Sequence, residues 1–250
     1  MKMGSDYAMG KEIEYLKEII DAVICIPNAF RIKIENTDKF IFSISTNDGK
    51  TEEWYAVAAI YDSICEIDAQ IKYAFNEVMR YELPETLENY NPFSNMNVQE
   101  REALYHIENI VFRVSILWDL LAQLSNVIYK TKLDPGHIYY KKYFKEHSEG
   151  ENTFELAKSV NSYLNEEDSL EHESTPWSGN HAFLTDYRNQ MTHRVHPNVS
   201  SITKFGMTLR PPALYVLHRT IEDYYKVSGF LCGQINNYLE ERKEWMPIGL

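Results

Sequence analysis

One short segment in the C-terminal half of the chain combines the side chains that phosphate chemistry requires. It reads Asp-Tyr-Arg-Asn-Gln-Met-Thr-His over residues 186–193, and its candidate catalytic residues are Arg188, Asn189 and His193. A histidine changes its charge near neutral pH and can therefore act as a general acid or base. An arginine presents a forked, permanently charged group that matches phosphate oxygens. The segment thus predicts acid–base chemistry on a phosphate group.

A single helix over residues 180–194 is expected to position this segment. Its apolar and polar residues separate onto different faces at the spacing of a helix. The apolar face consists of Phe183, Leu184, Tyr187 and Met191, and the polar stripe of Asp186, Asn189, Gln190 and His193. Because Pro197 disfavours a helical residue before it, the helix should end within a few residues of His193. The histidine then lies in the last turn, where the helix dipole favours its protonated form.

The spacing of Arg188 and His193 raises a geometric problem. Residues five apart on an ideal helix point about 140° away from each other. The two side chains can therefore act on one phosphate only if the helix end distorts or if the site is shared between two subunits. The second solution predicts a homodimer with this helix in a two-fold interface.

A second candidate site lies in residues 129–145, the only basic and aromatic-rich stretch in the sequence. It carries five Lys against one Asp, together with four Tyr and one Phe. Tyrosine can stack on unpaired RNA bases and lysine can contact phosphates, which makes a group of four the candidate RNA-binding residues. These are Tyr140, Lys141, Lys142 and Lys145. The alternative is an ordinary solvated helix face whose tyrosines pack inward.

The run Arg188-Asn189-Gln190-Met191-Thr192-His193 resembles the R-N-x-x-x-H signature of the HEPN superfamily, helical-bundle proteins of bacterial toxin, defence and CRISPR-associated systems. The resemblance implies a bundle of four or five helices that dimerises so that two motifs meet. It also implies metal-independent RNA cleavage by attack of the 2′-hydroxyl on the neighbouring phosphate. In that reading His193 moves the proton, Arg188 holds the phosphate and Asn189 orients one or both.

The resemblance leaves several functions open. A metal-independent endoribonuclease with a toxin or defence role would have an antitoxin or a nucleotidyltransferase as a candidate partner protein. The alternative is a non-catalytic, HEPN-like dimer that serves as a binding or assembly module, and a third reading is an unrelated helical interaction protein. No cofactor or metal is assigned, because no histidine and carboxylate pair has a metal-site spacing such as HExxH.

Structural explanations compete with catalysis at these residues. His193 could simply cap the end of its helix, as basic residues in last turns often do. Arg101 and His106 have the same offset as the motif pair, which shows that such pairs also arise by chance. A glutamate follows Arg101 and would repel a phosphate. The remaining histidines that we considered are expected on the surface or in packing contacts: His181, His196 and His218.

The rest of the pattern is that of an all-α protein. Amphipathic helices are expected over residues 11–25, 51–83, 99–129, 137–147, 153–164 and 211–244, with an irregular segment before Arg210 and a solvated acidic linker at 165–173. Alternating residues in 31–35 and 39–45 predict a small β-hairpin. We expect one HEPN-like helical domain over residues 1–250, with residues 26–50 as a β-hairpin appendage.

Composition narrows the classes of function. The chain has 44% hydrophobic residues and a net charge of -12, which suits a folded protein and disfavours indiscriminate binding to nucleic acid. Its three cysteines are widely spaced and are expected to be buried, reduced thiols. No stretch approaches the roughly 18 uncharged apolar residues of a membrane span and the N-terminus lacks an apolar leader, so a cytoplasmic protein is expected.

Overall fold

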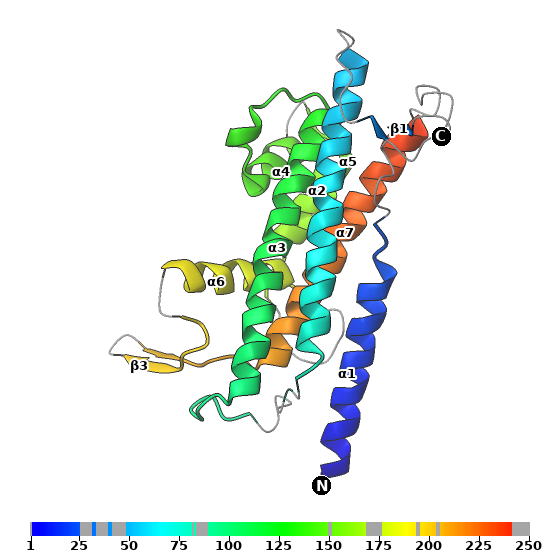
Figure 1. Cartoon of the computed structure of the whole chain (residues 1–250). Helices are drawn as coiled ribbons and strands as arrows, with labels where there is room; N and C mark the ends of the chain where they lie inside the picture. The colour runs from blue at the N-terminus through cyan, green and yellow to red at the C-terminus, as the bar shows by residue number, and fades with distance from the viewer. Residues whose placement is uncertain are drawn as a thin grey trace.

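The structure is a computed structural model that describes residues 2–25, 32–33, 40–41, 49–81, 83, 90–149, 152–168, 177–193, 196–203 and 206–241. Within these ranges the chain is predominantly helical (Figure 1). The α-helices are α1 (Lys2–Ala22), α2 (Gly49–Val78), α3 (Val98–Ile128), α4 (Tyr140–Ser148), α5 (Glu155–Leu164), α6 (Asn180–His193) and α7 (Ala213–Glu241). The other elements are a 3₁₀ turn, η2 (Pro135–His137), and the strands β1 (Ile32–Lys33), β2 (Phe40–Ile41), β3 (Ser201–Thr203) and β4 (Gly206–Thr208).

Helix α3 forms the centre of the bundle and packs most extensively on α2 and α7. Its apolar residues recur at helical spacing and are buried, among them Ile107, Val114 and Leu121. The side chain of Asn97 caps its first turn, because it accepts a hydrogen bond from the Glu100 N–H at 2.7 Å. Among the described helices, α3 is long and apolar enough to cross a membrane by length and composition, and 56% of that apolar stretch is buried inside the bundle.

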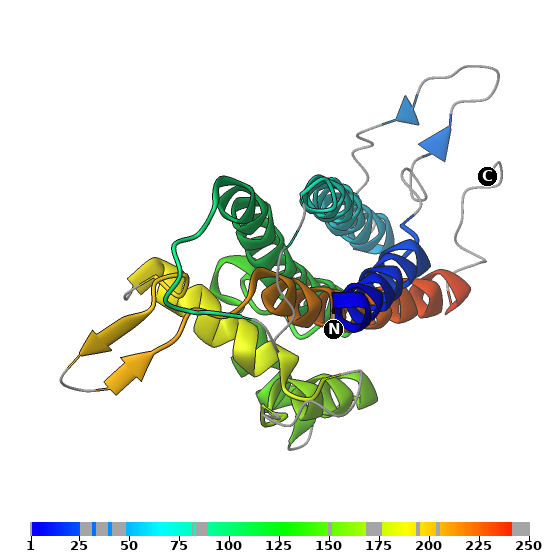
Figure 2. The same ribbon diagram turned by 90° about the horizontal axis from the view of Figure 1, so that it is seen from below.

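Helix α6 lies across the bundle rather than along it (Figure 1). It contacts α5, α7 and α3, and its C-terminal end reaches the outer edge of the bundle on the side of β3 and β4 (Figure 2). The turn into α6 requires Gly179, whose φ of 70° lies in the left-handed region. A Cβ at this position would come within 2.4 Å of the Asp168 backbone. Glycine therefore allows the chain to start α6 directly against the backbone of Glu167 and Asp168, which follow α5.

Most predicted helix boundaries agree with the structure within a few residues. The predictions at 99–129, 153–164 and 180–194 correspond to α3, α5 and α6. The helix predicted from residue 11 begins much earlier, at Lys2, and the helix predicted at 137–147 starts at Tyr140 because η2 comes first. The predicted continuations of α6 and α7, to 194 and 244, lie outside the described residues.

The two small sheets give one confirmed and one wrong prediction. The antiparallel pairing of β1 with β2 confirms the predicted N-terminal hairpin at those four residues, and the rest of the predicted appendage before Gly49 lies outside the described residues. The segment predicted as irregular contains a second antiparallel pair, with Ser201 opposite Thr208 and Ile202 opposite Met207. Sequence reasoning missed this pair because each strand has only three residues. The available signal was alternation on either side of Gly206.

The three cysteines are free and half-buried, and they lie close enough to influence one another. A hydrogen bond with Cys65 of α2, together with burial, raises the pKa of the Cys25 thiol, and the same hydrogen bond lowers the pKa of Cys65. Burial raises the pKa of Cys232 on α7. The thiols are thus reduced, as predicted, but they are neither fully buried nor far apart.

Candidate functional site

One face of α6 anchors the helix and leaves its other faces to carry the predicted motif. Leu184 and Tyr187 are buried, and Phe183 and Met191 pack against the same core. The Tyr187 hydroxyl donates a 2.8 Å hydrogen bond to Asn198 Oδ1, which ties the helix to the segment that follows it. The predicted apolar face of this helix is therefore confirmed.

Arg188 shares its surroundings with Asp119 of α3 and Lys141 of α4. Burial raises the pKa of the Asp119 carboxyl, and the positive charge of Arg188 opposes this rise. Burial lowers the pKa of the Lys141 ammonium, and the charge of Arg188 lowers it further. Two cations, Arg188 and Lys141, thus lie within electrostatic range of each other, with the Asp119 carboxylate in range of the first and the Asp223 carboxylate in range of the second.

Two polar contacts bring the basic stretch against α6. Lys141 Nζ donates to Thr185 Oγ1 at 3.2 Å, and the Tyr140 hydroxyl lies 3.0 Å from His181 Nε2. His181, Thr185 and Arg188 follow one another at helical spacing along one face of α6. The two regions that the sequence pointed to separately are therefore neighbours in space.

The four candidate RNA-binding residues differ in accessibility. Lys141, Lys142 and Lys145 are exposed. The Tyr140 ring is half-buried and stacks on Trp118, with 6.3 Å between ring centroids and 27° between the planes. The lysines are open to a ligand, whereas the tyrosine holds the start of α4 against the core.

The structure describes Asn189 completely and His193 through its backbone. Asn189 is half-buried, and its carbonyl oxygen accepts a 3.3 Å hydrogen bond from the Thr192 hydroxyl. Helix α6 is described as far as His193, and the predicted last residue, Arg194, lies outside the described residues. The His193 side chain lies outside the described residues, so the convergence of Arg188 and His193 stays a prediction.

The comparison pair Arg101 and His106 forms no common site. Arg101 lines a cavity at the start of α3, whereas His106 lines a different one together with Tyr105 and Arg113. The His106 ring also lies 6.4 Å from the Tyr81 ring. Equal spacing in the sequence thus does not bring these two side chains together.

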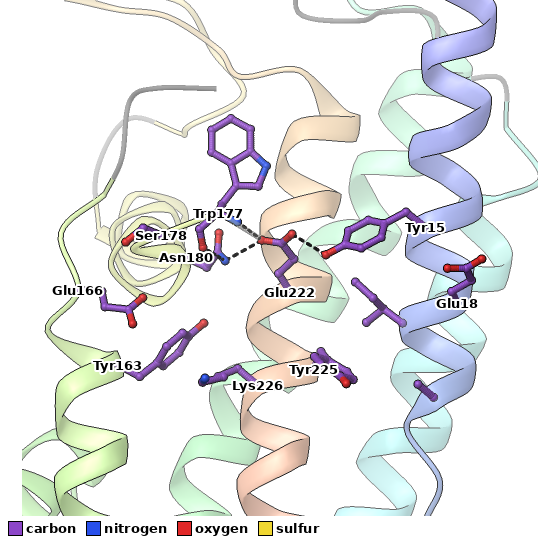
Figure 3. Close-up of a pocket in the computed structure, with 12 residues that line it drawn as sticks. Tyr15, Glu18, Tyr163, Glu166, Trp177, Ser178, Asn180, Glu222, Tyr225 and Lys226 are labelled. Atoms are coloured by element: carbon purple, nitrogen blue, oxygen red, sulfur yellow. Dashed lines mark hydrogen bonds between the residues drawn. The ribbon is translucent and has the colours of Figure 1, made fainter. Parts of the chain in front are cut away.

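The inner end of α6 enters a buried polar network centred on Glu222 of α7 (Figure 3). One carboxylate oxygen accepts hydrogen bonds from the Tyr15 hydroxyl and from His218 Nε2, each at 3.0 Å. The other accepts from the Trp177 N–H at 2.7 Å and from Asn180 Nδ2 at 2.9 Å. The four hydrogen bonds use the full accepting capacity of this carboxylate.

His218 carries a positive charge within this network. Burial alone would lower the pKa of its imidazole, but hydrogen bonds to Glu12 and Glu222 and the charges of these carboxylates outweigh burial and raise the pKa to about 9. Burial likewise favours a raised pKa for Glu222, and the hydrogen bond and charge of His218 reverse this and lower it. The two groups therefore form a buried ion pair at neutral pH.

Arg219 forms a second buried ion pair next to the first. Its guanidinium donates to Asp168 Oδ1 and to the Tyr215 hydroxyl, each at 2.7 Å, and to the Ser178 carbonyl at 3.1 Å. It also donates to the Asn180 side chain. Asp168 belongs to the stretch that was predicted as a solvated linker. Asp168 is exposed, as that prediction implies, but its carboxylate also supplies the counter-charge of a fully buried arginine, which the prediction did not include.

Asp223 completes the network on the side of α3 and α5. Its carboxylate accepts hydrogen bonds from the Tyr163 hydroxyl at 2.8 Å and from Trp118 Nε1 at 3.0 Å. Its Oδ2 also lies 3.5 Å from His181 Nδ1. His181 and His218 are thus buried in polar packing contacts, which was one of the two situations expected for them.

Sequence reasoning missed the charged cluster on α7. The signal was present, because His218, Arg219, Glu222 and Asp223 stand at positions i, i+1, i+4 and i+5 of an otherwise apolar helix. Such a set shares one side of a helix and can be mutually neutralising. Charged residues are usually exposed unless they are paired, and their partners come from distant segments that the pattern alone does not reveal.

A cavity of about 620 Å³ opens beside this network, between α1, α7 and the residues before α6 (Figure 3). Among the described residues, its walls carry Glu18, Glu166 and Glu222 but a single cation, Lys226. Aromatic side chains, including Trp177, supply much of the remaining lining. The excess of carboxylates repels phosphate, so an RNA backbone is not expected to bind in this cavity.

Neither a metal group nor a match to known proteins adds to this picture. In the part of the chain that the structure describes, no three histidine, cysteine, aspartate or glutamate side chains could hold a metal ion together. No family model, no curated protein and no solved structure matches the chain. The functional argument is therefore made from the residues of the site themselves.

Proposed function

We propose that this protein is a metal-independent endoribonuclease of the HEPN type, acting on single-stranded RNA at the outer end of α6. The observation that carries the proposal is the contact between two regions: Lys141 Nζ of the basic stretch donates a 3.2 Å hydrogen bond to Thr185 Oγ1 of α6, three residues before Arg188 of the R-N-x-x-x-H run. A pair of neighbouring cations is suited to a phosphodiester. The C-terminal end of α6, which follows Arg188 in the sequence, lies at the edge of the bundle (Figure 2).

The proposed reaction is an internal transfer that needs no metal ion. A His193 imidazole removes the proton of the 2′-hydroxyl, and O2′ attacks the adjacent phosphorus. The bond from phosphorus to O5′ then breaks, and a protonated imidazole donates a proton to O5′. The products are a 2′,3′-cyclic phosphate and a 5′-hydroxyl, so atoms and charges balance. Arg188 stabilises the extra negative charge that develops on the phosphorane.

The roles of Asp119 and Asn189 follow from their positions beside Arg188. The Asp119 carboxylate lies within electrostatic range of the guanidinium and also accepts a hydrogen bond from the Tyr140 backbone, which links Arg188 to the start of α4. Asn189 follows Arg188 directly and would orient the phosphate or the imidazole. Preorganised groups of this kind reduce the reorganisation that the reaction requires.

A homodimer is part of the proposal, because one helix cannot direct Arg188 and His193 at one phosphate without distortion. Two facing copies of α6 would let one His193 accept a proton while His193 of the partner subunit donates one. The hairpin beside α6 supports an interface on this side, since Ile202 is 75% exposed and Met207 is 58% exposed. A cytoplasmic toxin or defence role, with an antitoxin or nucleotidyltransferase partner, belongs to the same proposal.

The test is cleavage of a fluorescently labelled single-stranded RNA in the presence of EDTA. Arg188→Ala and His193→Ala should each reduce the cleavage rate by about 10²- to 10⁴-fold, the range for loss of acid–base assistance or of a preorganised charge. His106→Ala should cleave like the wild type, since its ring lies against Tyr81 and lines a cavity with Tyr73 and Arg113. Product analysis should find a 2′,3′-cyclic phosphate.

Two controls separate catalysis from folding and assembly. Thermal melts of Arg188→Ala should stay near those of the wild type, and light scattering of the same preparation should give a dimer mass. A well-folded dimer that binds RNA without cutting it, or that cuts equally well without His193, would favour the non-catalytic binding module. A strictly monomeric enzyme would remove the shared site.

A further inference from the structure

A polar cavity of about 340 Å³ lies at the start of α3, beside the segment that leaves α6. Two arginines, Arg101 and Arg210, line it, and none of the described residues in its lining is a carboxylate. The remaining polar lining includes Ser94, Asn95 and Asn198. Such a lining contrasts with the net charge of -12 of the whole chain and favours an anion.

Arg210, which lines this cavity, has one buried donor, its Nε–H, with no acceptor among the described residues. The side chain is 3% exposed, and its Nη1 lies 3.2 Å from Glu100 Oε1. Its Nη2 makes a long, 3.5 Å contact with the Ser94 carbonyl oxygen, and its Nε has no hydrogen-bond partner in the described part of the structure. A buried N–H without an acceptor is unfavourable, and an anionic oxygen in the cavity would satisfy it.

Arg101 supplies the positive charge that is not already neutralised. Glu100 offsets the charge of Arg210, whereas no hydrogen bond or ion pair joins the exposed Arg101 guanidinium to another described residue. Arg101 can therefore turn toward a ligand without breaking a contact. The two arginines would act differently, one as a fixed buried donor and the other as an adaptable surface charge.

The cavity is firmly connected to the proposed cleavage site. Asn198, one of its lining residues, accepts the hydrogen bond from Tyr187 of α6 at 2.8 Å and donates to Glu108 of α3 at 2.6 Å. Ser200, also in the lining, accepts a 3.0 Å hydrogen bond from the Arg210 N–H. The wall of the cavity thus continues directly from the residues that fix α6.

We propose that this cavity, the α3 phosphate pocket, binds one phosphate group of the RNA strand that α6 cleaves, at a position away from the scissile bond. The identity of the strand rests on the proposed function, whereas the preference for a phosphate rests on the pocket's own charge and donors. Contacts to the backbone do not distinguish bases, so the pocket contributes affinity and register but no sequence preference.

The test measures binding of a short single-stranded 2′-O-methyl RNA, which cannot be cut by 2′-hydroxyl attack, by fluorescence anisotropy over a series of NaCl concentrations. Arg101→Gln should weaken binding several-fold, equally for uridine-rich and adenosine-rich strands, and should reduce the slope of log affinity against log salt by about 0.7. The matched control Lys158→Gln, which removes an exposed cation on α5, should leave both unchanged. Arg210→Lys keeps the charge and should weaken binding without changing the slope.

The outcomes distinguish this inference from the proposed function. RNA binding that depends on Arg101 in a protein that cleaves nothing would uphold the pocket and refute the nuclease. Efficient cleavage with unchanged affinity and salt slope in both arginine variants would refute the pocket and uphold the nuclease. A separate experiment tests whether inorganic phosphate alone binds the pocket. If it raises the melting temperature of the wild type but not of Arg101→Gln, while RNA affinity is the same in both, the ligand is free phosphate and the RNA assignment fails.

Discussion

The two ends of α6 use the same residue types for opposite purposes. At the inner end, an asparagine, a histidine and an arginine meet as Asn180, His218 and Arg219, and every one of them is buried and bonded to a partner. At the outer end, the same three types appear as Asn189, His193 and Arg188. There Arg188 is only partly buried and sits beside another cation.

The two ends therefore differ in whether their polar groups already have partners, more than in the types of residue that they contain. The inner groups have their charges paired and their hydrogen bonds made, so they have no capacity left for a substrate. At the outer end, Arg188 is partly buried and Lys141 is exposed, so both cations are accessible from outside the bundle. Buried pairs mainly restrict the arrangement of the segments they join, whereas accessible cations can add binding energy when a phosphate binds.

The largest difference in stability is expected when one charged side chain is removed at each end of α6. Glu222→Gln should lower the free energy of unfolding by about 3–5 kcal/mol, because it removes one charge of a buried ion pair and places an NH2 group against two hydrogen-bond donors. Arg188→Gln should stay within about 0.5 kcal/mol of the wild type, as substitutions at accessible positions usually do. Urea unfolding of both variants provides the measurement. Equal stability losses would mean that the outer end is structural as well.

At the inner end, the free energy of unfolding should depend on pH through His218. The pKa of His218 is raised to about 9 in the folded protein, so its contribution to stability is complete below the unfolded value of about 6.5 and is lost as pH rises through 9. The loss should be on the order of 3 kcal/mol across this window. Urea unfolding at several pH values should show it. The variant His218→Gln should lack this slope, and an unchanged slope would assign the effect to other groups.

The smallest expected effect concerns the outer end alone. Replacing Lys141, Lys142 and Lys145 together by Gln should reduce the salt slope of RNA binding by up to about 2, at about 0.7 for each phosphate that the variant no longer neutralises. Stability should change little, because all three residues are exposed and the contacts of Lys141 with Thr185 and of Lys142 with Glu146 lie at the surface. Anisotropy titrations at several salt concentrations would decide. An unchanged slope would mean that this stretch is an ordinary solvated helix face and does not bind RNA.

The sequence predicted those features that depend on local pattern. Helix α6 was placed correctly because its apolar residues recur at helical spacing and Pro197 limits its end. The proximity of Arg188 to Lys141 could not be predicted, because it depends on how α4 and α6 pack against α3. The role of Asp168 was missed for the same reason, since its partner Arg219 lies in a distant helix. The pairing of β3 with β4 was missed because such short strands give a weak pattern.

A small change of backbone direction at Gly179 would move the far end of α6. Its backbone conformation and its close approach to Asp168 fix the angle at which the helix leaves the core. The helix has 14 residues, so its two ends are about 21 Å apart. A tilt of about 5° at the glycine would therefore displace the outer end by about 2 Å, a shift of the size that can reduce a reaction rate by two orders of magnitude. A side chain added at Gly179, far from Arg188, would thus shift the proposed cleavage site.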